Sequence, residues 1–94
     1  MKSYCIAHPK SPVTGKTYQW IKKKYKGIKI YSIERIILKE INNLKKHTRI
    51  KQGDFLVVEG KPADLSEIGE YDNYNKETES IKDKIERFLN SYKY

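Results

Sequence analysis

A continuous apolar run, Phe55-Leu56-Val57-Val58, constrains the fold of this chain more than any other segment. Four successive apolar residues place side chains on both faces of a strand, so both faces of the sheet must be covered. Such runs are typical of buried strands in parallel sheets, whereas a half-exposed antiparallel strand alternates apolar with polar residues. The run therefore predicts a parallel sheet flanked by helices.

The segments around this run are expected to alternate between strands and helices. Residues 3–7 and 28–31 are predicted strands. Helices are predicted from residue 13 or 14 to Gly27 (where 17–21 also fits a strand), from Ser32 to His47, over 64–71, and from Thr78 onward. This order predicts the α/β class, a small Rossmann-like three-layer domain with a short, mainly parallel sheet and right-handed crossovers.

The helix predicted after Ser32 rests on a clear periodicity. Its apolar residues recur at spacings of four, four and three positions, at Ile33, Ile37, Ile41 and Leu44. These spacings place the four side chains on one face of a helix. Ser32 is a favourable N-cap residue, and the basic residues 45–47 suit the negative end of the helix dipole.

Basic residues gather in the first half of the chain. Residues 1–52 contain fourteen lysines and arginines and two acids, whereas residues 53–94 contain six and ten, for a net charge of +8. This distribution predicts an electropositive surface that attracts a nucleic acid, a nucleotide or an anionic protein. A solvated lysine-rich surface that binds no ligand is the simpler interpretation of the same residues.

Length and composition narrow the remaining possibilities. The 94 residues predict one domain over 1–94, whose modest core favours a homodimer. There is neither an apolar run of membrane-spanning length nor a signal-peptide pattern, so we expect a cytoplasmic protein without a membrane partner. Cys5 is the single cysteine. With one cysteine and two distant histidines, we expect no disulfide, no metal site and no cofactor.

The loop after the first predicted strand carries the candidate catalytic residues, His8 and Lys10. The imidazole of His8 can transfer a proton near neutral pH, and Lys10 can stabilise charge that develops on a phosphate. Gly15-Lys16-Thr17 does not complete a P-loop. That motif requires a glycine five residues before Gly15, and this chain has Lys10 at that position. The loop therefore predicts phosphate binding without nucleoside-triphosphate chemistry.

The candidate ligand-binding residues follow from the predicted parallel sheet. In such a sheet the carboxyl ends of the strands open on one edge, where ligands bind. The strand ends near His8, Ser32 and Gly60 would then meet there, and the helix after Ser32 would add unpaired backbone N–H groups. The residues expected to contact the ligand are Ser11, Thr14, Lys16, Ser32, Gly60 and Lys61.

Several short motifs occur in an order that resembles the small CRISPR-associated ring nucleases. They are His8-Pro9, Trp20, Gly27-Ile28, Gly53-Asp54, the strand 55–58 and the turn 60–65. The family commonly has an arginine before its His-Pro pair and a glycine after it, where this chain has Ala7 and Lys10. The resemblance implies a dimer that holds a cyclic oligoadenylate across its two-fold axis and either cuts or sequesters it. Cutting would need no metal: a ribose 2′-OH would attack the neighbouring phosphate, assisted by His8 and Lys10.

Two other functions fit the same sequence. A non-enzymatic nucleic-acid-binding protein, of mobile-element or viral origin, would place its lysines on backbone phosphates and its aromatic rings on bases. The lysines suited to this role are Lys22, Lys23, Lys24, Lys26 and Lys29. A protein-interaction or inhibitor module would instead dock on an acidic surface. Neither alternative requires His8, so a His8 substitution separates them from ring cleavage.

Overall fold

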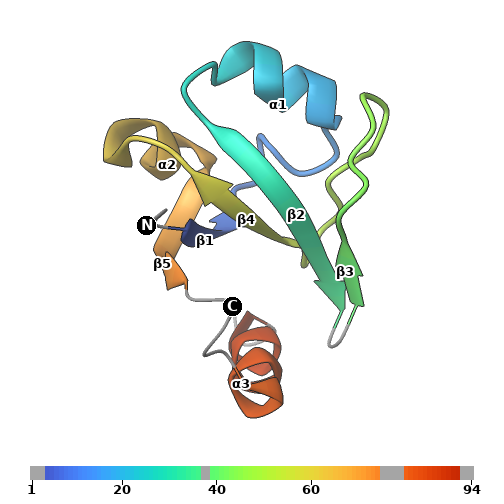
Figure 1. Cartoon of the computed structure of the whole chain (residues 1–94), viewed down its shortest axis with the longest axis vertical. Helices are drawn as coiled ribbons and strands as arrows, with labels where there is room; N and C mark the ends of the chain where they lie inside the picture. Colours follow the sequence, from blue (N-terminus) through green and yellow to red (C-terminus); the bar gives the residue numbers. More distant parts are fainter. Residues whose placement is uncertain (1–3, 37–38, 75–79, 92–94) are drawn as a thin grey trace.

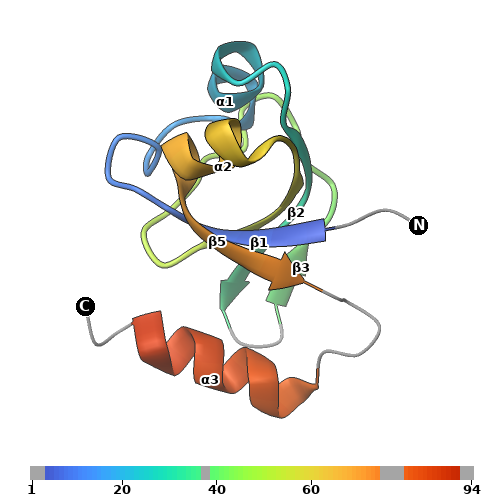
Figure 2. The ribbon, with the colours of Figure 1, turned by 90° about the vertical axis from the view of Figure 1, so that its left-hand side faces the viewer.

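The computed structural model describes residues 4–36, 39–74 and 80–91. Its elements are β1 (Tyr4–Pro9), α1 (Tyr18–Lys24), β2 (Lys29–Ile36), β3 (Lys39–Ile41), β4 (Phe55–Glu59), α2 (Pro62–Ile68), β5 (Gly69–Tyr74) and α3 (Ile81–Ser91). The five strands form one sheet in the order β3-β2-β4-β1-β5 (Figure 1). Helices α1 and α2 lie on one side of this sheet and α3 lies on the other (Figure 2). No helix among the described residues is long and apolar enough to cross a membrane.

Every pair of neighbouring strands in this sheet is antiparallel. The predicted Rossmann-like parallel sheet is therefore wrong, and the chain is a small α+β domain. Strand β4 is the central strand, and four of its five residues are buried. Helices cover both faces of the sheet, which explains the continuous apolar run: such a run indicates two-sided burial, and burial does not fix strand direction.

Strands β2 and β3 replace the helix predicted from Ser32 to His47. Strand β2 continues through Ser32, and Ile33 lies opposite Ile41 of β3. A shift in register between Ile30 and Ser32 lets Ile30 and Ile33 join the same core cluster despite their three-residue spacing. The predicted helical stripe instead crosses from β2 to β3, past a second shift in register between Glu34 and Ile36, and Ile37 of the stripe lies outside the described residues.

Other boundaries follow from local capping. Helix α1 begins after Thr17, whose hydroxyl oxygen accepts the Trp20 backbone N–H at 3.2 Å, and not at residue 13 or 14. The predicted final helix is present as α3. Ser80 and Asp83 cap it reciprocally, since each side chain accepts the backbone N–H of the other residue at 3.2 Å. The predicted cap Thr78 lies outside the described residues.

Two apolar clusters pack against the two faces of the sheet. The larger joins the sheet to α1 and α2, and includes Ile21, Ile33, Leu56, Leu65 and Ile68. The smaller joins it to α3 and consists of Ile6, Phe55, Val57, Tyr74 and Phe88. In the smaller cluster the Phe88 ring contacts Phe55 edge-on, with centroids 5.1 Å apart. Among the α3 side chains that the structure describes, Phe88 alone belongs to this cluster, so polar contacts contribute much of the attachment of the helix.

A buried carboxylate, Glu34 of β2, provides that polar attachment. Glu34 is 2% exposed. It accepts a hydrogen bond from the Tyr74 hydroxyl at 2.8 Å and another from Arg87 of α3, and Lys84 of α3 lies 3.9 Å away. Burial, followed by the hydrogen bond to Glu34, raises the pKa of Tyr74, so its hydroxyl stays protonated as a donor. The group joins two strands and a helix around one negative charge.

Candidate functional site

Antiparallel pairing separates the strand ends that a parallel sheet would bring together. Strand β1 runs opposite to β4, with Cys5 beside Val58 and Ala7 beside Leu56. His8 therefore lies near the start of β4, while Gly60 follows its other end. Ser32 is 3% exposed within β2, so no helix begins there. The predicted ligand-binding residues are thus divided among separate places.

One shallow depression does collect several of the predicted residues. It measures about 330 Å³, and its lining residues are His8, Pro9, Ser11, Thr14, Gln52 and Gly53. The His8 ring packs against Phe55, with centroids 5.1 Å apart and planes tilted by 36°. The structure therefore brings an imidazole and two hydroxyl groups to one place at the end of β1.

Lys10 lines a different depression from its predicted catalytic partner His8. That depression measures about 480 Å³ and is lined by Lys10, Ser66, Gly69, Glu70, Tyr71 and Asp72. The carboxylates of Glu70 and Asp72 offset the lysine charge there, which disfavours a phosphate. Among the described residues, no group of three or more His, Cys, Asp or Glu side chains is placed to hold a metal ion.

Gly60 and Lys61 line a third depression, of about 410 Å³, together with Gly27, Lys29, Tyr31 and Glu59. Within it, the Tyr31 hydroxyl donates a hydrogen bond to Glu59. The Lys29 ammonium lies 4.9 Å from the centroid of the Tyr31 ring. The hydrogen bond to Glu59, and then desolvation, raise the pKa of Tyr31 to about 12.

This hydrogen bond gives a prediction about pH. The Tyr31 phenol should ionise near pH 12 in the folded protein, against about 10 in the unfolded chain. Because the folded state holds its proton longer, the contribution of this group to stability is complete below pH 10 and is lost as the pH rises toward 12. The difference between absorbance titrations of the wild type and Y31F isolates this phenol. In E59Q its pKa should fall toward 10, and an unchanged value would contradict the role of Glu59.

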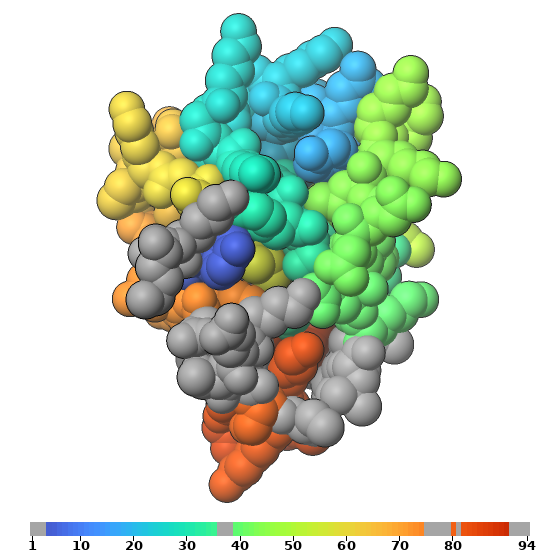
Figure 3. Space-filling view, in the orientation of Figure 1, coloured from blue at the N-terminus to red at the C-terminus, as the bar shows by residue number. Residues whose placement is uncertain are grey.

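Exposed basic side chains gather on α1, on the residue that precedes its N-cap, in the turn that follows it, and on the segment after β3. We call these residues the basic surface: Lys16, Lys22, Lys23, Lys24, Lys26, Lys45, Lys46 and Arg49. Backbone bonds join the segments, because the N–H groups of Tyr18 and Gln19 donate to the carbonyls of Thr48 and Lys46. The segment after β3 adjoins α1 in both the ribbon and the space-filling view (Figures 1 and 3).

Carboxylates from the same part of the chain are withdrawn from this surface. Residues 4–54 contain thirteen lysines and arginines and only three acids, Glu34, Glu40 and Asp54. Glu34 and Asp54 are 2% and 1% exposed, and each is ion-paired. Glu40 is partly exposed on β3. The surface is therefore more electropositive than the composition of this half of the chain indicates.

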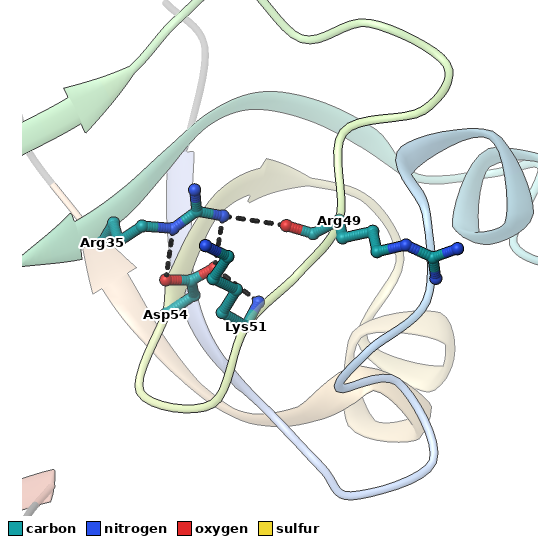
Figure 4. Close-up of polar contacts among 4 residues, drawn as sticks. All are labelled: Arg35, Arg49, Lys51 and Asp54. Carbon is teal, nitrogen blue, oxygen red and sulfur yellow. Dashed lines mark hydrogen bonds and ion pairs between the residues drawn. The ribbon is translucent and has the colours of Figure 1, made fainter.

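Asp54 also holds the loops of the basic surface together (Figure 4). Arg35 of β2 donates to both of its carboxylate oxygens, at 3.2 and 3.1 Å, and the Lys51 backbone N–H donates at 2.7 Å. Arg35 also donates to the Arg49 carbonyl at 2.8 Å, and Arg49 donates to the Gly15 carbonyl at 2.8 Å. These bonds link β2, the segment before β4 and the loop before α1.

Sequence reasoning missed Arg35, Arg49 and Asp54. Arg35 and Arg49 were expected in or just beyond a helix, and only the antiparallel pairing of β2 with β4 brings Arg35 to Asp54. The available signal was the Gly53-Asp54 turn, which places a carboxylate directly before a buried strand. A carboxylate at the edge of an apolar run requires a partner when it is buried.

Comparisons with known proteins add no assignment to this site. A scan against protein-family models found no match, and searches of curated proteins and of solved structures found none either.

Proposed function

We propose that this protein binds nucleic acid through the basic surface, chiefly by contacts with backbone phosphates. The observation that carries the proposal is the separation of charge: eight exposed cations lie on connected segments, while Glu34 and Asp54 are buried in ion pairs. Such an arrangement attracts polyanions and gives binding that weakens steeply with salt.

The spread of the cations favours an extended ligand over a single phosphate. They come from α1, from the loop before it, from the turn after it and from the segment after β3, and α1 and the segment after β3 adjoin one another on the face shown in Figure 3. Helix α1 has seven residues, a length of about 10 Å. A helix this short presents few side chains to a groove, so we expect little recognition of base sequence.

The test compares K23E/K46E with K82E. Both positions of the double variant lie on the basic surface, whereas exposed Lys82 lies on α3, across the sheet. Binding of a labelled oligonucleotide is followed by anisotropy between about 50 and 200 mM salt. With a single strand, the slope of log K against log salt should fall by about 1.4 in K23E/K46E, at about 0.7 for each lost phosphate contact. K82E should match the wild type. Absence of binding at the lowest salt, or equal losses in both variants, would contradict the proposal.

A second candidate function is recognition of a cyclic oligoadenylate, and one observation favours it. The depression at His8 combines an imidazole with the hydroxyls of Ser11 and Thr14, beside the lysine-containing loop 10–16. A ribose 2′-OH held there could transfer its proton to His8 as its oxygen attacks the adjacent phosphate, while the bond from phosphorus to the 5′-oxygen of the next nucleotide breaks and that oxygen takes a proton from the solvent. A homodimer would present two such depressions to one ring.

Incubation with cyclic tetra-adenylate in EDTA tests this second candidate. Turnover should give a linear product with a 2′,3′-cyclic phosphate, and H8A should abolish it. Binding without turnover supports sequestration in place of cleavage. Cleavage that persists in H8A removes His8 from the mechanism, and neither binding nor cleavage removes this candidate altogether.

A further inference from the structure

The single tryptophan of the chain, Trp20, lies within the basic surface between two of its lysines. The side chain is partly exposed, and its buried part packs against the core cluster beneath α1. The ammonium groups of Lys16 and Lys24 lie 5.1 and 4.9 Å from the ring centroid. The Tyr25 ring contacts the indole edge-on, with centroids 6.4 Å apart. The indole is therefore held in place by the helix and surrounded by positive charge.

We infer that Trp20 is a base-stacking position, and that the protein consequently prefers single-stranded to duplex nucleic acid. This inference rests on the proposed function and specifies its ligand. A nucleotide complements the site with both of its parts: the base stacks on the indole, and the adjoining phosphates pair with Lys16 and Lys24.

The arrangement of charge around the indole supports a ligand with these two parts. Two ammonium groups over one ring lie within about one Debye length at 0.1 M salt, roughly 10 Å, so they repel each other. Phosphates on either side of a stacked base would relieve this repulsion. A base–aromatic stack is also stronger than a single cation–π contact at an exposed site, and the two ammonium groups that leave the ring gain phosphates as partners in exchange.

The preference for single strands follows from access to the base faces. In a duplex, each base is paired and stacked on its neighbours, and it reaches a protein ring only after it is extruded, which costs free energy. Bases of a single strand offer their faces without that cost. Backbone contacts to lysines remain available in either form, so duplex should still bind, more weakly, through the basic surface.

Because Trp20 is the only tryptophan, its fluorescence reports directly on stacking. The wild type is titrated with a single-stranded oligonucleotide, the matching duplex and inorganic polyphosphate, with anisotropy or competition measuring binding in parallel. The single strand should quench the emission with the same midpoint as its binding curve. Polyphosphate and duplex should bind with much less quenching. A single strand that binds without changing the emission, or polyphosphate that quenches equally, overturns the inference.

Two substitutions test the same point through affinity. W20L removes the aromatic face and should weaken single-strand binding about tenfold, within the range for loss of one stacked base, while duplex binding changes little. W20F keeps a flat ring and should stay close to the wild type. If W20L does not fold, the fluorescence titration of the wild type still tests the inference.

Equal affinity of W20L and the wild type for the single strand overturns stacking on Trp20 and leaves the proposed function intact. If K23E/K46E and K82E bind the oligonucleotide with the same affinity and the same dependence on salt, the proposed function itself is overturned.

Discussion

Replacing Gly69 with alanine is expected to destabilise the fold by at least about 3 kcal/mol, at or beyond the upper end of ordinary overpacking. Gly69 begins β5 directly after α2 and lies beside Pro9 of β1. A Cβ at this position would lie 1.8 Å from the His8 carbonyl oxygen, 2.8 Å from the His8 carbonyl carbon and 3.2 Å from the Lys10 nitrogen. All three atoms belong to the backbone, so no side-chain rotation relieves the overlap. Either β5 separates from β1, or the end of β1 moves.

Thermal and denaturant unfolding of G69A measure this effect. A loss of 3 kcal/mol corresponds to a fall in Tm of about 12–24 °C for a domain of this size. The matched control is G53A, at a glycine with φ of +89°, where an added Cβ would meet no atom within 4 Å. That variant bears only the strain of a left-handed backbone, about 1–2 kcal/mol. Stability of G69A equal to or above that of G53A would show that the close approach at β1 is absent in solution.

The second large effect is expected from Arg87, which neutralises the buried Glu34 carboxylate from α3. R87M should lower the free energy of unfolding by about 3 kcal/mol, because removal of one partner leaves a buried charge without its main counterion. E34L should cost less, since the cationic side chains of Lys84 and Arg87 are 21% and 16% exposed and can turn toward water, and the Tyr74 hydroxyl that loses its acceptor is uncharged. The Glu34 carboxylate, at 2% exposure, cannot reach water in the same way.

The double variant E34L/R87M separates charge pairing from packing. With both charges gone, we expect part of the stability lost in R87M to return, because apolar residues can replace a buried ion pair at little cost, while the buried Tyr74 hydroxyl still lacks its Glu34 acceptor. Urea unfolding of the wild type, both single variants and the double variant gives the coupling energy. Simple addition of the two single effects would show that Arg87 contributes through its cation–π contacts with the Phe55 and Tyr74 rings, at 5.6 and 5.5 Å, and not through its ion pair with Glu34.

The errors in the predicted fold have a common physical origin. The spacing of apolar residues indicates which side chains share a buried face. The spacing of Ile33 and Ile41 is compatible both with a helix and with a pair of antiparallel strands. In a helix they would lie about two turns apart, whereas in the structure they face each other across a hairpin. Isoleucine favours a strand at such positions, but this preference is decided by tertiary context. Strand β5 was missed because its exposed middle residues are polar, as an edge strand allows.

The candidate site was foreseen only where it depended on composition or on local sequence. The excess of basic residues in the first half is visible in the chain, and it does form an exposed surface. His8, Ser11 and Thr14 lie in one depression because they belong to one loop. Residues expected to meet through the parallel sheet, such as Ser32 and Gly60, do not meet. The burial of Asp54 and Glu34, which makes the surface so positive, depends on strand pairing that no local pattern encodes.

The sheet order also has a consequence for the synthesis of the chain. Strand β1, the first of the five strands in the sequence, pairs with β4 and β5, which end at Glu59 and Tyr74. The residues that pair with Ile6 and Ala7 therefore lie roughly fifty or more positions later in the sequence. Contacts between such distant segments slow folding, because the entropy cost of closing a long loop precedes the strand contacts that offset it. The apolar side chains of β1 therefore stay unburied in the nascent chain until β4 and β5 have been synthesised.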